Sequence, residues 1–195
     1  MQRNPSSGDL SNPESRGPER PRDPAAKGVP DFSQLPSCGD FDMRIARDGT
    51  WFYRGSPIGR KPLVKLFSTV LRREDGEFWL VTPVERGRIL VDDAPFVAVA
   101  VDAEGNGAAQ NLTFRTNVDD EVIADAAHPI RVAVDPRRGE PIPYVMIRNG
   151  LEARILRSVY YHLVELGELA VIEGVEQLGV WSAGVFFPLG RVEEK

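Results

Sequence analysis

Apolar residues recur along the chain with two periods, one helical and one strand-like, so we expect a mixed α+β fold. Apolar positions 63, 66, 67, 70 and 71 form one helical face over residues 62–71, and Pro62 suits the first helical turn. Ser158 is a suitable N-cap for a second helix through Leu166, and Gly167 is placed to end it. The remaining runs predict strands at residues 77–82, 88–91, 95–101, 112–118, 122–124, 130–135, 142–148, 151–155 and 179–187.

Two hairpin signals divide this pattern into halves. Asp48-Gly49 and Asn149-Gly150 each lie between runs of strand-forming residues, and both dipeptides tolerate the positive φ that a two-residue turn requires. Hairpin, helix and tryptophan-bearing strand then recur roughly 100 residues apart. We therefore predict two small mixed units packed side by side, with helices covering sheets.

Composition places the boundaries of these units. Residues 1–30 are rich in Pro, Ser, Arg, Asp and Glu, so we expect a disordered Pro/Arg-rich tail. Residues 31–94 form the predicted N-terminal unit and residues 95–195 the C-terminal unit. The tail has no apolar core of a secretory signal, and the longest apolar run, residues 96–101, falls far short of the roughly 20 residues that span a bilayer.

Charge and cysteine content limit the nucleic-acid binding, disulfide bonding and metal binding that we expect of this chain. A formal net charge of −5 opposes a general attraction to nucleic-acid backbones. The single cysteine, Cys38, excludes a disulfide framework or a multi-thiolate metal site within one chain. We expect a cytoplasmic protein without membrane attachment, metal or cofactor.

The sequence contains no recognisable catalytic signature. A nucleophilic triad needs a base, and only His128 and His162 are available. His162 falls beside acidic and hydroxyl side chains on the predicted helix, which favours a solvated histidine. We therefore expect no catalytic residues, although Glu85, Asp92 and Asp93 leave an unrecognised carboxylate enzyme open.

Arginine and aromatic residues crowd both hairpins and the strands that follow them. Arginine binds phosphate or carboxylate through two parallel hydrogen bonds and also stacks on aromatic rings. In the binding interpretation, arginines contact negative groups, Trp51 or Tyr144 stacks on a planar ring, and Asp92 or Asp93 binds hydroxyls. Alternatively, the arginines decorate solvent-facing strand edges and the paired aspartates cap a turn. The candidate ligand-binding residues are Arg44, Trp51, Arg86, Asp92, Asp93, Arg115, Tyr144 and Arg148.

Four long segments also carry a family resemblance. They are GDFDMRIARDGTWFYRGSPIGRKPLVKLFSTVLRRE, FWLVTPVERGRILVDDAPFVAV, LTFRTNV and PYVMIRNGLEARILRSVYYHLVELG, and they resemble the bacterial domain-of-unknown-function family 1285. The resemblance covers residues 39 to the C-terminus. It implies two α+β domains with a duplicated motif, a C-terminal unit that is superficially pleckstrin-homology-like, a ligand site between the domains that suits a nucleotide-like molecule, and a role in signal transduction.

Three functional hypotheses follow from the residues and the resemblance. The first is a non-catalytic binding or sensor protein that holds a small anionic, nucleotide-like ligand between its two units. The second is a protein–protein interaction module that uses exposed sheet edges or a helix. The third is an unrecognised enzyme.

Overall fold

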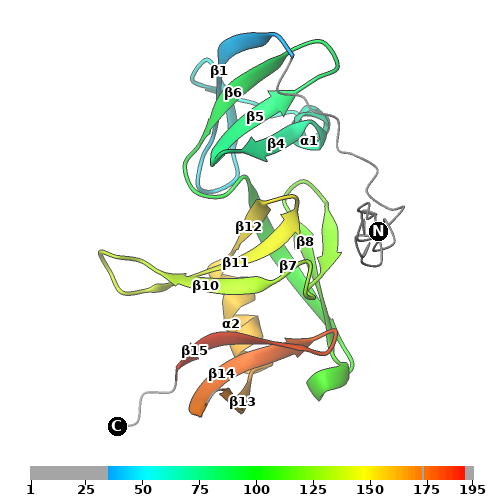
Figure 1. The fold of residues 1–195 in the computed structure, drawn as a ribbon, viewed down its shortest axis with the longest axis vertical. Coiled ribbons are helices and arrows are strands. Elements are labelled where there is room, and N and C mark those ends of the chain that lie inside the picture. The colour runs from blue at the N-terminus through cyan, green and yellow to red at the C-terminus, as the bar shows by residue number, and fades with distance from the viewer. Residues whose placement is uncertain (1–34, 173, 192–195) are drawn as a thin grey trace, which may run out of the picture. The chain divides into compact units, whose positions relative to one another are not determined.

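The computed structural model describes residues 35–172 and 174–191, and Figure 1 shows their strands and helices. The predicted tail of residues 1–30 lies outside the described residues. Most of the described secondary structure is β-strand, arranged in three sheets with two α-helices.

The first sheet contains six strands in the order β3-β2-β1-β6-β5-β4. Their bounds are β1 Ser37–Ile45, β2 Trp51–Tyr53, β3 Ser56–Pro57, β4 Leu71–Glu74, β5 Glu77–Val81 and β6 Arg86–Val91. Strands β1 and β2 are antiparallel around the predicted turn, whereas β1 and β6 run parallel. Gly49 has a φ of +82°, the positive value that makes glycine favourable in this turn.

The second sheet also contains six strands, in the order β10-β11-β12-β7-β8-β9. Their bounds are β7 Phe96–Glu104, β8 Asn111–Thr116, β9 Glu121–Ile123, β10 Ile130–Val134, β11 Pro141–Arg148 and β12 Leu151–Ile155, and a short 3-10 helix, η2, spans Gly107–Ala109. Asn149 and Gly150 both have positive φ, 45° and 77°, so the predicted second hairpin turn is confirmed.

The third sheet and the helices complete the fold. Strands β13 (Glu168–Ile172), β14 (Val175–Ser182) and β15 (Val185–Arg191) form an antiparallel sheet in chain order. The helices are α1 (Lys61–Thr69) and α2 (Arg157–Glu165). Neither of these helices is long and apolar enough to cross a membrane.

Three local predictions are wrong. Leu71 begins strand β4 rather than ending the first helix, because its backbone pairs with Leu80 of β5. Ser158 lies inside the first turn of α2, and Leu156 occupies the N-cap position without a side-chain cap. Residues 179–187 belong to two strands, because a turn at Ala183-Gly184 with φ of 48° and 76° reverses the chain.

The order of elements occurs twice along the chain. A hairpin, a helix and three antiparallel strands form the series β1–β2, α1, β4–β6 and then the series β11–β12, α2, β13–β15. The sheets differ between the two series. Strand β6 pairs with β1 of its own hairpin, whereas β13–β15 form a separate sheet.

One hydrophobic core joins residues from both halves of the chain. Trp51, Phe96 and Phe114 are its largest fully buried side chains, and the ring of Trp51 stacks on that of Phe67 with centroids 6.2 Å apart. A polar link accompanies this packing. The side-chain amide of Asn117 donates to the Gly49 carbonyl, 3.3 Å away, and its oxygen accepts from the backbone N–H of Val97 at 3.0 Å.

Candidate functional site

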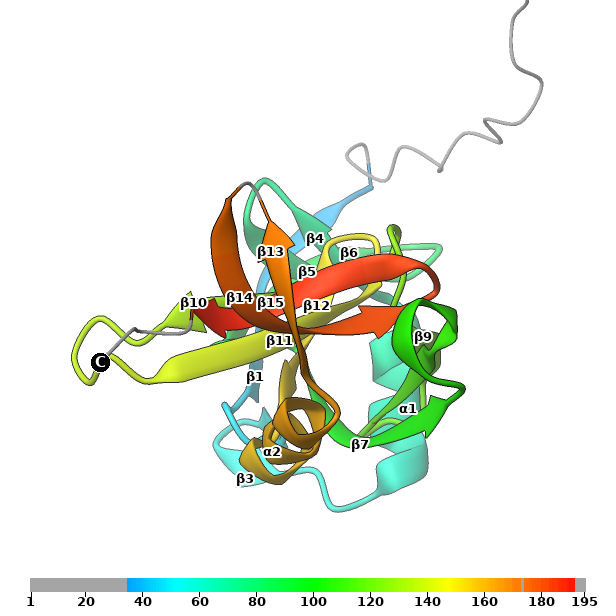
Figure 2. The same cartoon turned by 90° about the horizontal axis from the view of Figure 1, so that it is seen from below.

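A polar cavity of about 500 Å³ lies between the β1–β2 turn and the connection from β10 to β11. That connection projects outward from its strands in both views of the ribbon (Figures 1 and 2). We call this cavity the arginine cleft, and its lining consists of Arg47, Asp135, Pro136, Arg137, Arg138, Glu140, Pro141, Ile142 and Arg154. Four arginines against two carboxylates make the lining positively charged in a chain whose net charge is −5.

The sequence Asp135-Pro-Arg-Arg-Gly139 builds the outer wall of the cleft. The Asp135 carboxylate accepts backbone N–H groups from Arg137 at 2.8 Å and Arg138 at 3.2 Å, which holds the pKa of Asp135 below its usual value. The carboxylate is therefore engaged by the backbone rather than by the guanidinium groups. Within residues 35–172 and 174–191, neither arginine forms an ion pair, and both are exposed.

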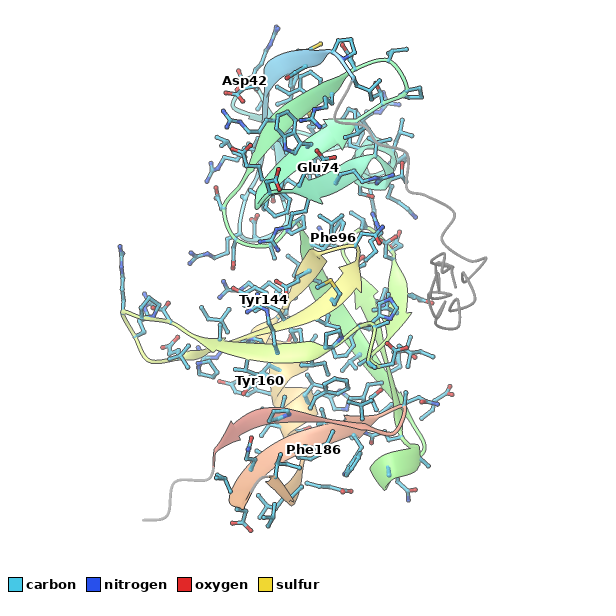
Figure 3. All side chains as sticks on the ribbon, viewed as in Figure 1. Asp42, Glu74, Phe96, Tyr144, Tyr160 and Phe186 are labelled. Atoms are coloured by element: carbon cyan, nitrogen blue, oxygen red, sulfur yellow. The ribbon has the colours of Figure 1, made fainter. Side chains whose placement is uncertain are left out.

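Asp93 does not itself line the cleft, but its carboxylate contacts two of the lining arginines, Arg47 and Arg154, and the neighbouring Tyr144. Its carboxylate accepts hydrogen bonds from the guanidinium of Arg154 and from the hydroxyl of Tyr144, the latter at 2.6 Å. Arg47 approaches the same carboxylate at 3.9 Å. Figure 3 labels Tyr144 on its strand. Asp93 thus ties the link between β6 and β7 to strands β11 and β12.

Arginine also covers the ring of Tyr144. The guanidinium of Arg131 lies 4.2 Å from the ring centroid and is held by Glu152, whose two oxygens accept hydrogen bonds at 2.6 Å each. Burial, followed by the hydrogen bond to Asp93, raises the pKa of Tyr144 to about 12. The phenol therefore remains a neutral hydrogen-bond donor at physiological pH.

This pKa shift predicts an alkaline loss of stability. The pKa of Tyr144 is 10.0 in the unfolded chain and about 12 in the folded chain. The stabilisation of the folded chain by the neutral phenol is therefore complete below pH 10 and is lost as pH rises through about 12. Denaturant unfolding between those pH values should show a falling free energy of unfolding, with a shallower fall in Tyr144→Phe. An equally steep fall in both proteins would show that other groups cause the alkaline loss of stability. One such group is Tyr160, because burial raises its pKa as well.

A second cavity, of about 510 Å³, shares Glu140, Pro141 and Arg154 with the arginine cleft. Apart from Arg157, the residues that line this cavity and not the cleft are aromatic or apolar, and we call the cavity the aromatic pocket. Figure 3 labels one of them, Tyr160 on α2. Tyr161 is 51% exposed, and its hydroxyl accepts a hydrogen bond from Nε of Arg157 at 2.7 Å. The further lining residues are Pro143, Ile155, Leu156, Arg157, Tyr160 and Tyr161.

None of the predicted site residues lines the cleft, but two of them lie next to it: Asp93 accepts a hydrogen bond from the lining residue Arg154, and Tyr144 donates to Asp93. The neighbouring Asp92 instead accepts two hydrogen bonds from Arg44, one from Nε at 2.8 Å, and this pairing lowers the pKa of Asp92. Arg44 lines a different cavity, of about 470 Å³, on the first sheet.

Four other predicted residues lie away from the cleft. Trp51 is 1% exposed, so its ring has no free face for a ligand, and its assignment as a stacking residue is corrected. Arg86 is paired with Glu74 and lies over the ring of Trp79. The remaining two are Arg115, exposed on β8, and Arg148, which donates to Asp120 and to the Ser68 carbonyl.

The central arginines of the cleft were absent from the predicted site. Arg137 and Arg138 lie in a Pro- and Gly-containing turn, and that turn signal beside two adjacent cations was the available clue. Arg47 and Arg154 flank the two hairpins, but only the folded chain brings them to one cavity.

No group of three His, Cys, Asp or Glu side chains among the described residues could hold a metal ion. The exposed Cys38 thiol donates to Glu85 at 2.9 Å, and this hydrogen bond raises the pKa of Cys38, which lowers its thiolate fraction. The Glu85 carboxylate is therefore occupied as the acceptor of the Cys38 thiol.

Fold and site together define a β-rich protein with a repeated element order and an arginine-lined cleft. The chain belongs to the DUF1285 family. The family model of the N-terminal domain, described as a domain of unknown function, matches residues 33–94. The family model of the C-terminal domain, described as belonging to a protein of unknown function, matches residues 95–189. This confirms the family resemblance of the sequence.

Two solved DUF1285 family proteins are similar to this chain. The protein from Silicibacter pomeroyi DSS-3 is 54% identical, with a TM-score of 0.77, over 85% of this chain and 90% of that one. The protein from Shewanella baltica OS155 is 26% identical, with a TM-score of 0.52, over 64% of this chain and 91% of that one. The comparison with curated proteins finds no match.

Proposed function

We propose that this protein is a non-catalytic binding or sensor protein that holds a small anionic, nucleotide-like ligand in the arginine cleft. One observation carries the proposal: Arg47, Arg137, Arg138 and Arg154 line a single cavity of about 500 Å³. Planar guanidinium groups bind phosphate and carboxylate oxygens through paired, charge-assisted hydrogen bonds. Because Arg137 and Arg138 have no ion pair among the described residues, their donors are available to a ligand.

The aromatic pocket supports the nucleotide-like part of the proposal. It shares Arg154 with the cleft, so one ligand can place an anionic group among the arginines and a planar group beside Tyr161. Arginine and tyrosine both stack on planar rings. The family resemblance adds a role in signal transduction and a pleckstrin-homology-like C-terminal unit to what we propose, and the composition of the chain adds a cytoplasmic location.

A protein-interaction role is the second candidate, and one surface favours it. Strand β13 lies at an edge of the third sheet and exposes Leu169 (57%) and Val171 (69%). An exposed edge strand with apolar side chains can pair with another chain. Specific capture of a partner, without any response to small anions, would favour this function over ligand binding.

Loss of the two unpaired arginines tests ligand binding. Inorganic pyrophosphate and adenosine diphosphate should raise the melting temperature of the protein in a concentration-dependent manner. The double variant Arg137→Ala, Arg138→Ala should weaken binding of pyrophosphate at least about tenfold by calorimetry, because two charge-assisted donors are removed. Its stability without ligand should stay close to that of the unmodified chain, since both side chains are exposed.

Arg115→Ala is the matched control. Like the double variant, it removes an exposed arginine, but Arg115 lies on strand β8 and does not line the cleft. Pyrophosphate affinity should therefore be unchanged in Arg115→Ala. Absence of any anion response in the unmodified chain, or an equal loss of affinity in Arg115→Ala and the double variant, would overturn the proposed site.

A further inference from the structure

We infer that Asp93, which borders the arginine cleft and contacts its Arg154 and Arg47, is a specificity-determining residue whose carboxylate acts as an internal anion and disfavours singly charged ligands. The inference rests on the proposed function, because it concerns which anions the same cleft accepts. Ligands with two or more negative charges, such as phosphate monoesters and pyrophosphates, would be accepted. Ligands with one charge, such as phosphodiesters and simple carboxylates, would bind much more weakly, because Asp93 competes with them for Arg154 and Arg47.

The contacts of Asp93 carry this inference. Arg154, which lines both the cleft and the aromatic pocket, donates to one oxygen of the Asp93 carboxylate, and Tyr144 donates to the other. Arg47, the cleft arginine from the β1–β2 turn, approaches at 3.9 Å. Two of the four cleft arginines are therefore already directed at a carboxylate before a ligand arrives.

Burial makes this internal anion difficult to displace. The Asp93 side chain is only 15% exposed, and water cannot fully replace a lost arginine partner in such a position. When a singly charged ligand binds Arg154 in place of Asp93, Arg154 only exchanges one anionic partner for another. The partly buried Asp93 carboxylate is then left poorly paired. The gain of the ligand at Arg154 is therefore offset by the loss at Asp93.

A multiply charged ligand can bind Arg137 and Arg138 in addition, on the side of the cleft formed by the β10–β11 connection. Arg137 and Arg138 supply donors that Asp93 does not occupy, so a second negative charge gains contacts without displacing the internal carboxylate. The lining has four arginines and two carboxylates, and Asp93 reduces its remaining positive charge further. The cleft then distinguishes ligands by their number of charges.

The neighbouring aspartate provides a matched control. Asp92→Asn and Asp93→Asn each remove one negative charge, one residue apart, but Asp92 is paired with Arg44, outside the cleft. A general change in electrostatic potential would affect both variants alike. A local competition for Arg154, which donates to Asp93, would affect Asp93→Asn alone.

Calorimetric titration with inorganic pyrophosphate and with dimethyl phosphate tests the inference on the full chain. In the unmodified protein, pyrophosphate should bind and dimethyl phosphate should bind at least about a hundredfold more weakly. In Asp93→Asn, the affinity for dimethyl phosphate should rise at least about tenfold, while that for pyrophosphate rises by less than about threefold. Asp92→Asn should leave both affinities unchanged.

Each other outcome overturns a distinct claim. Unchanged selectivity in Asp93→Asn, or an equal change in Asp92→Asn, overturns the role of Asp93 while pyrophosphate binding still supports the cleft. Absence of pyrophosphate binding in all three proteins overturns the proposed function itself. Asp93→Ser, which removes the charge but keeps an acceptor for Tyr144, repeats the measurement if Asp93→Asn does not fold.

Discussion

Replacing Trp51 with alanine is expected to lower the free energy of unfolding by about 3–5 kcal/mol, the largest effect of any substitution considered for this protein. Trp51 is 1% exposed and stacks on Phe67, so truncation leaves a large cavity in the core. Urea unfolding followed by circular dichroism measures the loss.

Trp51→Phe separates packing from polarity at the same position. The indole Nε1 is buried and has no hydrogen-bond partner among the described residues, so phenylalanine removes an unsatisfied donor together with part of the ring. We expect a loss of only about 1–2 kcal/mol, with pyrophosphate affinity unchanged. An alanine variant as stable as the unmodified chain, or a phenylalanine variant that folds but no longer binds pyrophosphate, would contradict the assignment of Trp51 to the core.

Arg148→Ala is expected to cost about 1–3 kcal/mol, because it leaves two acceptors without their cation. The guanidinium donates to Asp120 and to the Ser68 carbonyl at the end of α1, and it lies 4.9 Å from the centroid of the Phe96 ring. Arg148 belongs to residues 95–189 and Ser68 to residues 33–94, so the hydrogen bond to the Ser68 carbonyl joins the two ranges that the family models match. Denaturant unfolding measures the effect.

Arg148→Lys is the informative companion variant. Lysine retains the charge but lacks the planar fork that reaches two acceptors while covering a ring. It should therefore recover only part of the lost stability, and pyrophosphate affinity should remain unchanged in both variants because Arg148 does not line the cleft. Full recovery by lysine would show that charge alone matters, and a loss of binding would return Arg148 to the candidate site.

Local signals predicted the elements more reliably than the site. The hairpin at Asn149-Gly150 followed from residues that tolerate positive φ, and the helix over residues 62–71 followed from its apolar face, although it ends at Thr69. The error at Leu71 has a tertiary cause. Leu71 fits both the helical and the strand period of apolar residues, and only its pairing with Leu80 decides that it belongs to a strand.

The candidate site depended on contacts that no local pattern encodes. Of the arginines predicted to bind a ligand between the two halves, Arg44 is paired with Asp92 and Arg148 with Asp120. The side chains of Arg137 and Arg138 remain available to a ligand, because Asp135 accepts hydrogen bonds from their backbone N–H groups rather than from their guanidinium groups. Whether an arginine meets a carboxylate or a cavity depends on residues distant in the chain.

The sequence by itself determined family membership, both hairpin turns and the order of most elements, because turn chemistry and hydrophobic periodicity act over a few residues. Only the tertiary structure decided that the ring of Trp51 faces the core and that Asp93 holds Arg154 at the cleft. These outcomes depend on packing between segments as much as 61 residues apart, where burial and charge pairing, rather than local preference, dominate the free energy.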